Sequence, residues 1–236
     1  QYYQLLEKRQ NIRVVRWNGK FNYSAINNFG YTFAKGEYIL LLNNDTEVIS
    51  VDWLQEMLMY AQRGDVGAVG AKLYYPDNTV QHGGIVLGVG GVAAHLHCNR
   101  QKEDPGYMGR LIYAQDLTAV TAACMMLPRK VWEETGGLDE SFEVAFNDVD
   151  LCLKVRSHGH LIVYDPYVKL YHYESKSRGT EDSEEKVRRF QTEIEYMRCH
   201  WLDILKKGDP YYNKNLSLTK WNYSLKPLPG MGKKKG

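Results

Sequence analysis

Residues 38–47 read Tyr38-Ile-Leu-Leu-Leu-Asn43-Asn44-Asp45-Thr46-Glu47, an apolar run that ends in polar and acidic residues. An unbroken run of Ile and Leu is typical of a strand that is buried on both faces, as in a parallel α/β sheet. Open α/β sheets bind ligands at the carboxyl ends of their strands. A carboxylate there suits a divalent cation that holds a phosphate or diphosphate, because hard cations prefer oxygen ligands. A plain Asn/Asp turn is the alternative interpretation.

A second acidic cluster, Asn147-Asp148-Val149-Asp150, opens a segment with the pattern of a helix. Asn147 is a suitable N-cap, and Asp in the first turn favours the helix dipole, so capping alone would explain the cluster. A carboxylate at a helix start beside a sheet edge can also accept a proton from a hydroxyl group. The two clusters together indicate a metal–phosphate site and a general base.

Apolar and polar patterns alternate along the chain and predict strands and helices in turn. Strands are expected over residues 12–15, 38–42, 66–72, 117–127 and 161–164. Helices are expected over residues 24–34, 52–62, 129–135, 149–157 and 184–205. Ser24 and Asp52 are the expected N-caps of the first two helices, and a hairpin turn is expected at Asp77-Asn78. This alternation predicts an α/β fold, a Rossmann-like and mostly parallel sheet with helices on both faces.

Composition limits the possible functions. The 236 residues are 44% hydrophobic, enough for one substantial core. The net charge of +2 shows no excess of basic residues of the kind typical of nucleic-acid-binding proteins. The four cysteines show no CxxC spacing, and Cys124 and Cys152 fit buried thiols in a reducing cytoplasm. The longest weakly polar run, residues 83–96, is shorter than the roughly 20 apolar residues that a bilayer requires.

Several stretches, in this order and spacing, resemble a family 2 glycosyltransferase with the GT-A fold. Residues 22–30, 34–38 and 42–45 resemble its nucleotide-binding half, and residues 123–126, 136–142 and 147–150 its acceptor-binding half. Residues 208–216 are similar to the C-terminal segment of rhamnosyltransferase-like members that build bacterial surface polysaccharides. The resemblance covers about residues 11–218, so we expect a single GT-A domain over 1–218 and a tail over 219–236.

The resemblance implies an inverting transfer of a sugar from a nucleotide-diphosphate donor, with a divalent metal, Mg or Mn, as cofactor. Asp45 would bind the metal with His172, and Asp148 would deprotonate the acceptor hydroxyl. The expected donor-binding residues are Asn28, Gly30, Asn43, Asn44, Asp45, Lys176 and Arg178. The expected acceptor-binding residues are Trp132, Phe146 and Asn147, although core packing is the commoner fate of such aromatic side chains.

The sequence departs from the family pattern in three places. The metal motif usually reads Asp-x-Asp, and Asn43 replaces its first acid; the base motif often reads Glu-Asp, and Asn147 replaces its Glu. The two opening strands of the family, which contact the nucleobase and ribose, are not recognisable here. We therefore expect a chain truncated at its N-terminus.

The resemblance also implies a saccharide or lipid-linked saccharide acceptor, in the cytoplasm and at the inner face of the membrane. Lysines 233–235 suit either anionic lipid or a solvated tail. Two other functions stay open at this point. One is a non-catalytic carbohydrate-binding or scaffold module, which the Asn replacements favour. The other is a nucleotidyltransferase, although the sequence has no Gly-rich phosphate loop near its start.

Overall fold

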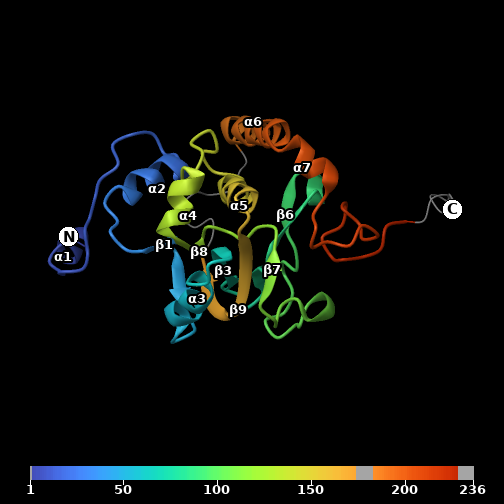
Figure 1. Ribbon diagram of the computed structural model, residues 1–236, viewed down its shortest axis with the longest axis horizontal. Helices are drawn as coiled ribbons and strands as arrows, with labels where there is room; N and C mark the ends of the chain where they lie inside the picture. The colour runs from blue at the N-terminus through green and yellow to red at the C-terminus, as the bar shows by residue number, and fades with distance from the viewer. Residues whose placement is uncertain (1, 174–182, 228–236) are drawn as a thin grey trace.

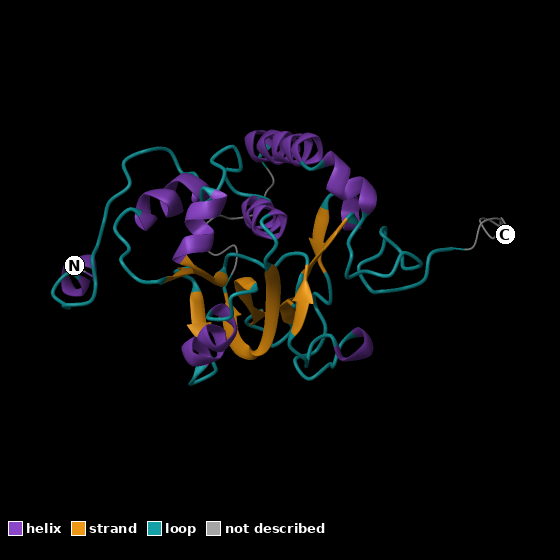
Figure 2. Ribbon diagram, viewed as in Figure 1, coloured by secondary structure: helices purple, strands orange, loops and turns teal. Residues whose placement is uncertain are grey.

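A central sheet with helices on two sides forms the body of the protein, as Figures 1 and 2 show. The structure is a computed structural model that describes residues 2–173 and 183–227. The predicted diphosphate ligands Lys176 and Arg178, and the lysines at 233–235, lie outside these residues. No helix within the described ranges is long and apolar enough to cross a membrane.

The strands of the described residues form a seven-stranded sheet and a separate two-stranded sheet. The large sheet contains β1 (Tyr38–Leu42), β2 (Thr46–Val48), β3 (Val66–Tyr74), β4 (Val80–His82), β7 (Gln115–Leu117), β8 (Cys124–Pro128) and β9 (Leu161–His172). Its main order is β1-β8-β3-β9-β2, with β4 paired to β3 and β7 paired to β9. The small sheet pairs β5 (Ile85–Leu87) with β6 (Ala93–His95).

The prediction of a mostly parallel sheet is wrong in its strand pairing. Only β3 and β9 pair in parallel among the described strands; every other pair is antiparallel. Strands β1, β3 and β9 do share one direction, as their helical connections predict. However, β8 inserts between β1 and β3 in the opposite direction, and this long-range insertion leaves no local signal in the sequence.

The helices of the described residues are α1 (Tyr2–Leu6), α2 (Tyr23–Tyr31), α3 (Trp53–Ala61), α4 (Arg129–Thr135), α5 (Asn147–Ser157), α6 (Glu184–His200) and α7 (Leu202–Lys207). Two short 3-10 turns are η1 (Val89–Gly91) and η2 (Tyr107–Gly109). The expected helix over 184–205 is interrupted at Trp201, where the backbone has φ −112° and ψ 25°. Helix α4 ends at Gly136 and Gly137 as predicted, and both residues have positive φ.

Helices cover both faces of the sheet, which confirms that part of the predicted α/β class. On β8, Cys124 and Met126 pack in one apolar cluster with Met57 of α3. Their neighbours Met125 and Leu127 pack in a second cluster with residues of α4 and α5. This separation follows from the two-residue period of a strand. In β1, however, Leu42 is 43% exposed, so this strand is not buried on both faces.

Three local predictions need correction. Residues 12–15 form no strand, and the expected strand over 117–127 is divided between β7 and β8. Asn22, not Ser24, caps α2, because its side chain accepts a hydrogen bond from the Ala25 N–H. Ser24 is buried and donates instead to the Phe142 carbonyl.

Packing continues beyond the predicted domain boundary at residue 218. Tyr223 is buried and belongs to an apolar cluster with Val86, Leu96 and Tyr212. The Lys226 N–H also donates to the Asn215 carbonyl at 2.8 Å. The segment that follows residue 218 therefore contacts the domain as far as residue 226.

Candidate active site

Asp45 and His172 meet at one edge of the sheet. Asp45 lies in the turn between β1 and β2, and His172 is the last residue of β9. The antiparallel pairing of β2 and β9 places Thr46 opposite His172 and brings the neighbouring Asp45 to the same place. The His172 Nε2 atom lies 3.2 Å from Oδ1 of Asp45. The two residues predicted as metal ligands are therefore adjacent in space.

The hydrogen bonds of His172 determine its tautomer. Nδ1 lies 2.7 Å from Oε1 of Gln81, whose amide nitrogen donates to the His172 carbonyl at 3.3 Å. Because Oε1 only accepts, the contact with Gln81 needs a proton on Nδ1, and the neutral tautomer with this proton has a lone pair on Nε2. The Asn43 amide donates to that lone pair at 3.1 Å. Imidazole is thus held with its ligating nitrogen directed at the Asp45 carboxylate.

These residues fit a divalent metal. Nε2 and a carboxylate oxygen lie 3.2 Å apart, and a cation that replaced the Asn43 amide at Nε2 would bind both atoms. The second-sphere bond from Nδ1 to an amide oxygen is the arrangement usual for metal-ligating histidine. Within the described residues no group of three His, Cys, Asp or Glu side chains is close enough to hold a metal. Two protein ligands suffice for Mg²⁺, which usually keeps water and substrate phosphate oxygens in its coordination sphere.

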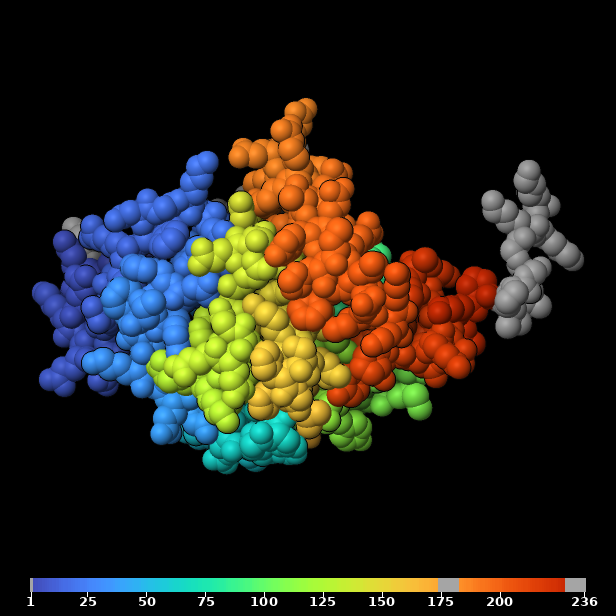
Figure 3. Space-filling view, turned by 45° about the horizontal axis from the view of Figure 1, so that its top comes forward, coloured from blue at the N-terminus to red at the C-terminus, as the bar shows by residue number. Residues whose placement is uncertain are grey.

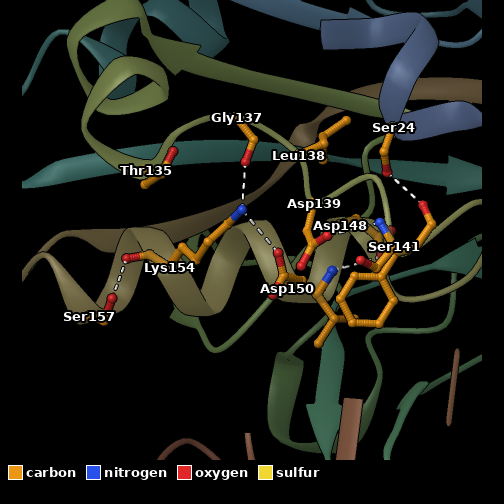
Figure 4. Close-up of polar contacts among 12 residues, drawn as sticks. Ser24, Thr135, Gly137, Leu138, Asp139, Ser141, Asp148, Asp150, Lys154 and Ser157 are labelled. Carbon is orange, nitrogen blue, oxygen red and sulfur yellow. Dashed lines mark hydrogen bonds and ion pairs between the residues drawn. The ribbon is translucent and has the colours of Figure 1, made fainter. Parts of the chain in front are cut away.

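Asp148 stands in the first turn of α5, and Figure 4 shows it with the polar contacts of that helix. Its Oδ1 accepts a hydrogen bond from the Val149 N–H at 2.8 Å, and its Oδ2 accepts one from the Ala122 N–H at 3.3 Å. The carboxylate is only partly buried and has further lone pairs. It is therefore fixed in orientation but still able to accept a proton from a hydroxyl group.

A two-residue segment, Ala122 and Ala123, joins the turn that holds Asp45 to Asp148. The Ala122 N–H donates to Asp148, and the Ala123 carbonyl accepts a hydrogen bond from the Asn43 N–H at 2.9 Å. His82 holds the residue that precedes this segment, since its Nε2 atom accepts a hydrogen bond from the Thr121 N–H at 3.4 Å. Burial, with the nearby His95 and His172, lowers the pKa of His82 well below its usual value. A neutral His82 keeps the lone pair that this bond needs.

The loop before Asp148 is held in an unusual conformation. Phe146 has φ 61° and ψ 2°, a left-handed backbone that is uncommon for a bulky side chain and marks local strain. Its ring stacks on Phe190 of α6 at a centroid distance of 5.7 Å. The buried Glu193 of the same helix accepts hydrogen bonds from the Val144 and Ala145 N–H groups at 2.7 and 3.3 Å. Helix α6 thus fixes the backbone that leads to Asp148.

A neighbouring ion pair holds α5 against the loop after α4. The Lys154 ammonium lies 3.1 Å from the buried Asp150 carboxylate and donates to the Gly137 carbonyl at 2.6 Å, as Figure 4 shows. Asp150 also accepts a hydrogen bond from the Trp201 indole N–H at 2.8 Å. Asp150 therefore has a structural role in this acidic cluster, and Asp148 is the carboxylate left accessible.

The structure does not support two of the predicted acceptor contacts. Trp132 is 3% exposed and stacks on Tyr31 at 5.2 Å, so its ring has no free face for a sugar. Asn147 is 4% exposed and is the first residue of α5 rather than the expected N-cap, and the N-cap is Phe146. Its side-chain amide donates to the Val144 carbonyl of the preceding loop. Phe146 is the predicted acceptor residue that stays partly exposed.

The predicted donor residues are distributed over two places. Asn43 lies beside His172, and Asn44 is exposed in the same turn. Asn28 is directed elsewhere: its amide donates to the Leu138 carbonyl and accepts from the Leu138 N–H, both within 3.0 Å. Gly30 lies within α2, and nothing would contact a Cβ built on it. The structure therefore gives Asn28 a role in joining α2 to the loop after α4.

Three contributions were missed by the sequence analysis: Gln81, the Ala122–Ala123 backbone and Glu193. The predicted hairpin at Asp77-Asn78, which the structure confirms, places Gln81 on β4 beside β3. Only the parallel pairing of β3 with β9 then brings it to His172. Backbone groups leave no signal in side-chain patterns, and Glu193 looks like any polar residue of an amphipathic helix. None of the three was accessible to local reasoning.

Comparisons with known proteins agree with this architecture. Residues 8–192 match the family model described as glycosyltransferase like family 2. The chain is 49% identical over 217 residues to the uncharacterized protein y4gI of Sinorhizobium fredii (strain NBRC 101917 / NGR234), covering 92% of this chain and 24% of that protein. It is 40% identical over 237 residues to the O-antigen biosynthesis protein RfbC of Myxococcus xanthus, covering 97% of this chain and 18% of that protein. The chain thus spans at most a quarter of the length of these curated relatives.

The fold has counterparts among solved structures. The crystal structure of GalNAc-T7 with UDP, GalNAc and Mn²⁺ aligns with a TM-score of 0.58 and 13% sequence identity, over 87% of this chain and 40% of that chain. The architecture is therefore that of the GT-A nucleotide-sugar transferases, as the motifs predicted. Because the family model matches most of the chain, the protein belongs to glycosyltransferase like family 2.

Proposed function

We propose that this chain is the catalytic part of an inverting glycosyltransferase, which moves a sugar from a nucleoside diphosphate to a saccharide acceptor. One observation carries the proposal: Asn43 contacts His172 of the Asp45–His172 pair and donates to Ala123, and the preceding residue Ala122 donates to the Asp148 carboxylate. A cation-binding pair for a diphosphate and a base for a hydroxyl are the two parts that a direct displacement needs.

At the donor end, Asp45 and His172 would hold a divalent metal, Mg or Mn. When bound, the metal would neutralise negative charge on the diphosphate leaving group. Gln81 accepts the Nδ1 proton of His172, so Nε2 would bind the metal once the Asn43 amide no longer donates to it. Asn43 orients the same ring from the other side. These residues prepare the donor side and do not themselves form a bond to the sugar.

At the acceptor end, Asp148 would accept the proton of the attacking hydroxyl group. The acceptor oxygen forms a bond to the anomeric carbon while the bond from that carbon to the diphosphate oxygen breaks. The proton moves to the Asp148 carboxylate, and the electron pair leaves with the nucleoside diphosphate. A single displacement of this kind inverts the anomeric configuration.

The similarity to RfbC supports a role in the synthesis of a bacterial surface polysaccharide. We extend the proposal to a saccharide acceptor that is lipid-linked and reached from the cytoplasmic face of the membrane. The donor sugar and its nucleotide would be identified by titration of the protein with UDP, dTDP and GDP, with and without Mn²⁺.

The decisive experiment compares Asp148→Asn with Asp45→Asn. We expect Asp148→Asn to bind the donor nucleotide as the unmodified protein does and to lose transfer by at least a hundredfold, because only the base is removed. We expect Asp45→Asn to weaken metal-dependent nucleotide binding. Undiminished transfer by Asp148→Asn would disprove the role of this base. Failure of the unmodified protein to bind any of the nucleotides would favour a non-catalytic carbohydrate-binding module.

A further inference from the structure

A pocket lies between the loop that contains η2 and the C-terminal segment. Its volume is about 570 Å³, within the usual range for small-molecule sites. Five tyrosines line it, together with Arg110, Gln115 and Asn213. In Figure 3 the C-terminal segment, in red, lies beside the green residues that include this loop. The pocket is therefore built from two segments that are far apart in the sequence.

This pocket is separate from the candidate active site. Tyr211 receives a hydrogen bond from Arg156, in the last turn of α5, at 3.1 Å. Asp148 is in the first turn of that helix, eight residues away, a rise of about 12 Å. Gln115 lies on β7, which pairs with the first half of β9, whereas His172 ends that strand. The two sites thus lie toward opposite ends of the same elements.

The pocket wall is rigid. Arg110 donates to the Tyr211 carbonyl at 2.7 Å and its guanidinium lies over the Tyr223 ring, while the Gln115 amide donates to the Arg110 carbonyl. Tyr107 and Tyr223 stack almost in parallel, at a centroid distance of 4.7 Å and an angle of 8°. The main-chain and stacking contacts hold these rings in place before any ligand binds, which lowers the entropic cost of binding.

The mouth of the pocket offers an open aromatic ring. Tyr113 is 61% exposed. Its ring lies against Gly109, so close that a Cβ atom built on this glycine would be 2.7 Å from the ring. Within the described residues, the hydroxyls of Tyr107 and Tyr113 make no hydrogen bond. Sugar rings present apolar C–H faces to aromatic rings and hydroxyls to amides and phenols, so this lining matches a saccharide. Arg110 is the only basic side chain of the lining, which does not favour a diphosphate.

We propose that this pocket binds a distal part of the acceptor glycan, several sugar units from the end that receives the new residue. This inference rests on the proposed glycosyltransferase function and specifies how the acceptor is held. A growing polysaccharide extends beyond the reacting hydroxyl, and a second contact far from the base raises the affinity for long acceptors over short ones.

The test uses neutral di- to hexasaccharides of rhamnose, mannose, glucose and galactose, with binding measured by ligand-detected NMR. We expect at least one oligosaccharide to bind and Tyr113→Ala to weaken that binding at least tenfold. Tyr113→Phe should retain most of it, because the ring face remains. Tyr167→Ala is the matched control, since Tyr167 is 51% exposed but lies on β9 outside the pocket.

Two results would overturn the inference: no oligosaccharide binds, or Tyr113→Ala binds as the unmodified protein does. Loss of UDP, dTDP or GDP binding in Tyr113→Ala would also overturn it, because the pocket would then belong to the nucleotide. Metal-dependent nucleotide binding by the unmodified protein is measured in parallel. If that binding is present while saccharide binding is absent, the distal site fails and the proposed transferase function stands. The reverse pattern contradicts the transferase function and, with it, the acceptor role of the pocket, while saccharide binding by the pocket itself stands.

Discussion

The Nε2 atom of His172 lies 3.2 Å from Oδ1 of Asp45, although His172 is the last residue of β9 and Asp45 lies in the turn after β1. Their approach results from the antiparallel pairing of β2 with β9. Gln81 then fixes which ring nitrogen faces the carboxylate. The proposed metal binding at this site therefore depends on a residue that does not itself contact the metal position.

Replacement of Gln81 by leucine should weaken metal binding. Without Oε1 as acceptor, the proton of His172 is no longer held on Nδ1, and the tautomer with Nε2 protonated cannot ligate. We expect a 10- to 100-fold loss of Mn²⁺ affinity in the presence of the donor nucleotide, the size usual for such second-sphere partners. Electron paramagnetic resonance of free Mn²⁺ measures this change.

Two further variants make that result specific. Gln81→Glu should retain much of the affinity, because a carboxylate also accepts the Nδ1 proton. Gln191→Leu, on the exposed side of α6, should have no effect. Equal Mn²⁺ affinity in Gln81→Leu and in the unmodified protein would contradict the assigned tautomer.

Replacement of Glu193 by alanine should reduce turnover without weakening donor binding. The side chain provides the acceptor for two backbone N–H groups of the loop that leads to Asp148. Loss of this acceptor leaves two partly buried N–H donors unpaired, at a cost of up to roughly 1–3 kcal/mol. Because Asp148, the proposed base, is displaced while Asp45 and His172 are untouched, we expect kcat to fall and the nucleotide affinity to stay constant. A parallel fall in nucleotide affinity would indicate general unfolding instead.

Part of this architecture was predictable because local patterns determine it. The apolar run before Asp45, the hairpin at Asp77-Asn78 and the Gly136-Gly137 helix end all act over a few residues, and the structure reproduces them. The proximity of Asp45 to His172 was foreseen through the family resemblance, not through periodicity.

The remainder depends on contacts between distant segments. Strand β8 lies between β1 and β3. The sequence of one strand does not determine which other strands it pairs with. Trp132 has the same chemistry on a surface or in a core, and only its contact with Tyr31 decides between them. The tyrosine-lined pocket likewise arises only when the C-terminal segment reaches Arg110.

Trp132 gives a direct test of core packing against acceptor binding. Its replacement by alanine should lower the free energy of unfolding by about 3–5 kcal/mol, as is usual for a buried aromatic residue. Trp221→Ala is the control, since Trp221 is 62% exposed, and it should change stability by less than about 0.5 kcal/mol. Chemical denaturation followed by circular dichroism measures both. A stable Trp132→Ala protein with weakened acceptor binding would restore the acceptor role.

Lys72 should make stability depend on pH in the alkaline range. Its side chain is 3% exposed and donates to the Leu111 carbonyl at 3.0 Å, and burial lowers its pKa from 10.5 to about 8. Between these two pH values the unfolded chain binds more protons than the folded one, so the free energy of unfolding contributed by Lys72 rises with pH. Below pH 8 the full cost of the buried charge is present.

Comparison with Lys72→Met isolates this effect, because methionine does not titrate. We expect the stability of the unmodified protein relative to Lys72→Met to increase from pH 8 to pH 10.5 by up to about 3 kcal/mol, the free energy of a shift of this size. Lys35→Met, at an exposed position, should show no such increase. Urea denaturation at a series of pH values provides the curves. If the curves of the unmodified protein and Lys72→Met stay parallel throughout, the ammonium group of Lys72 is solvated and the burial of its charge is disproved.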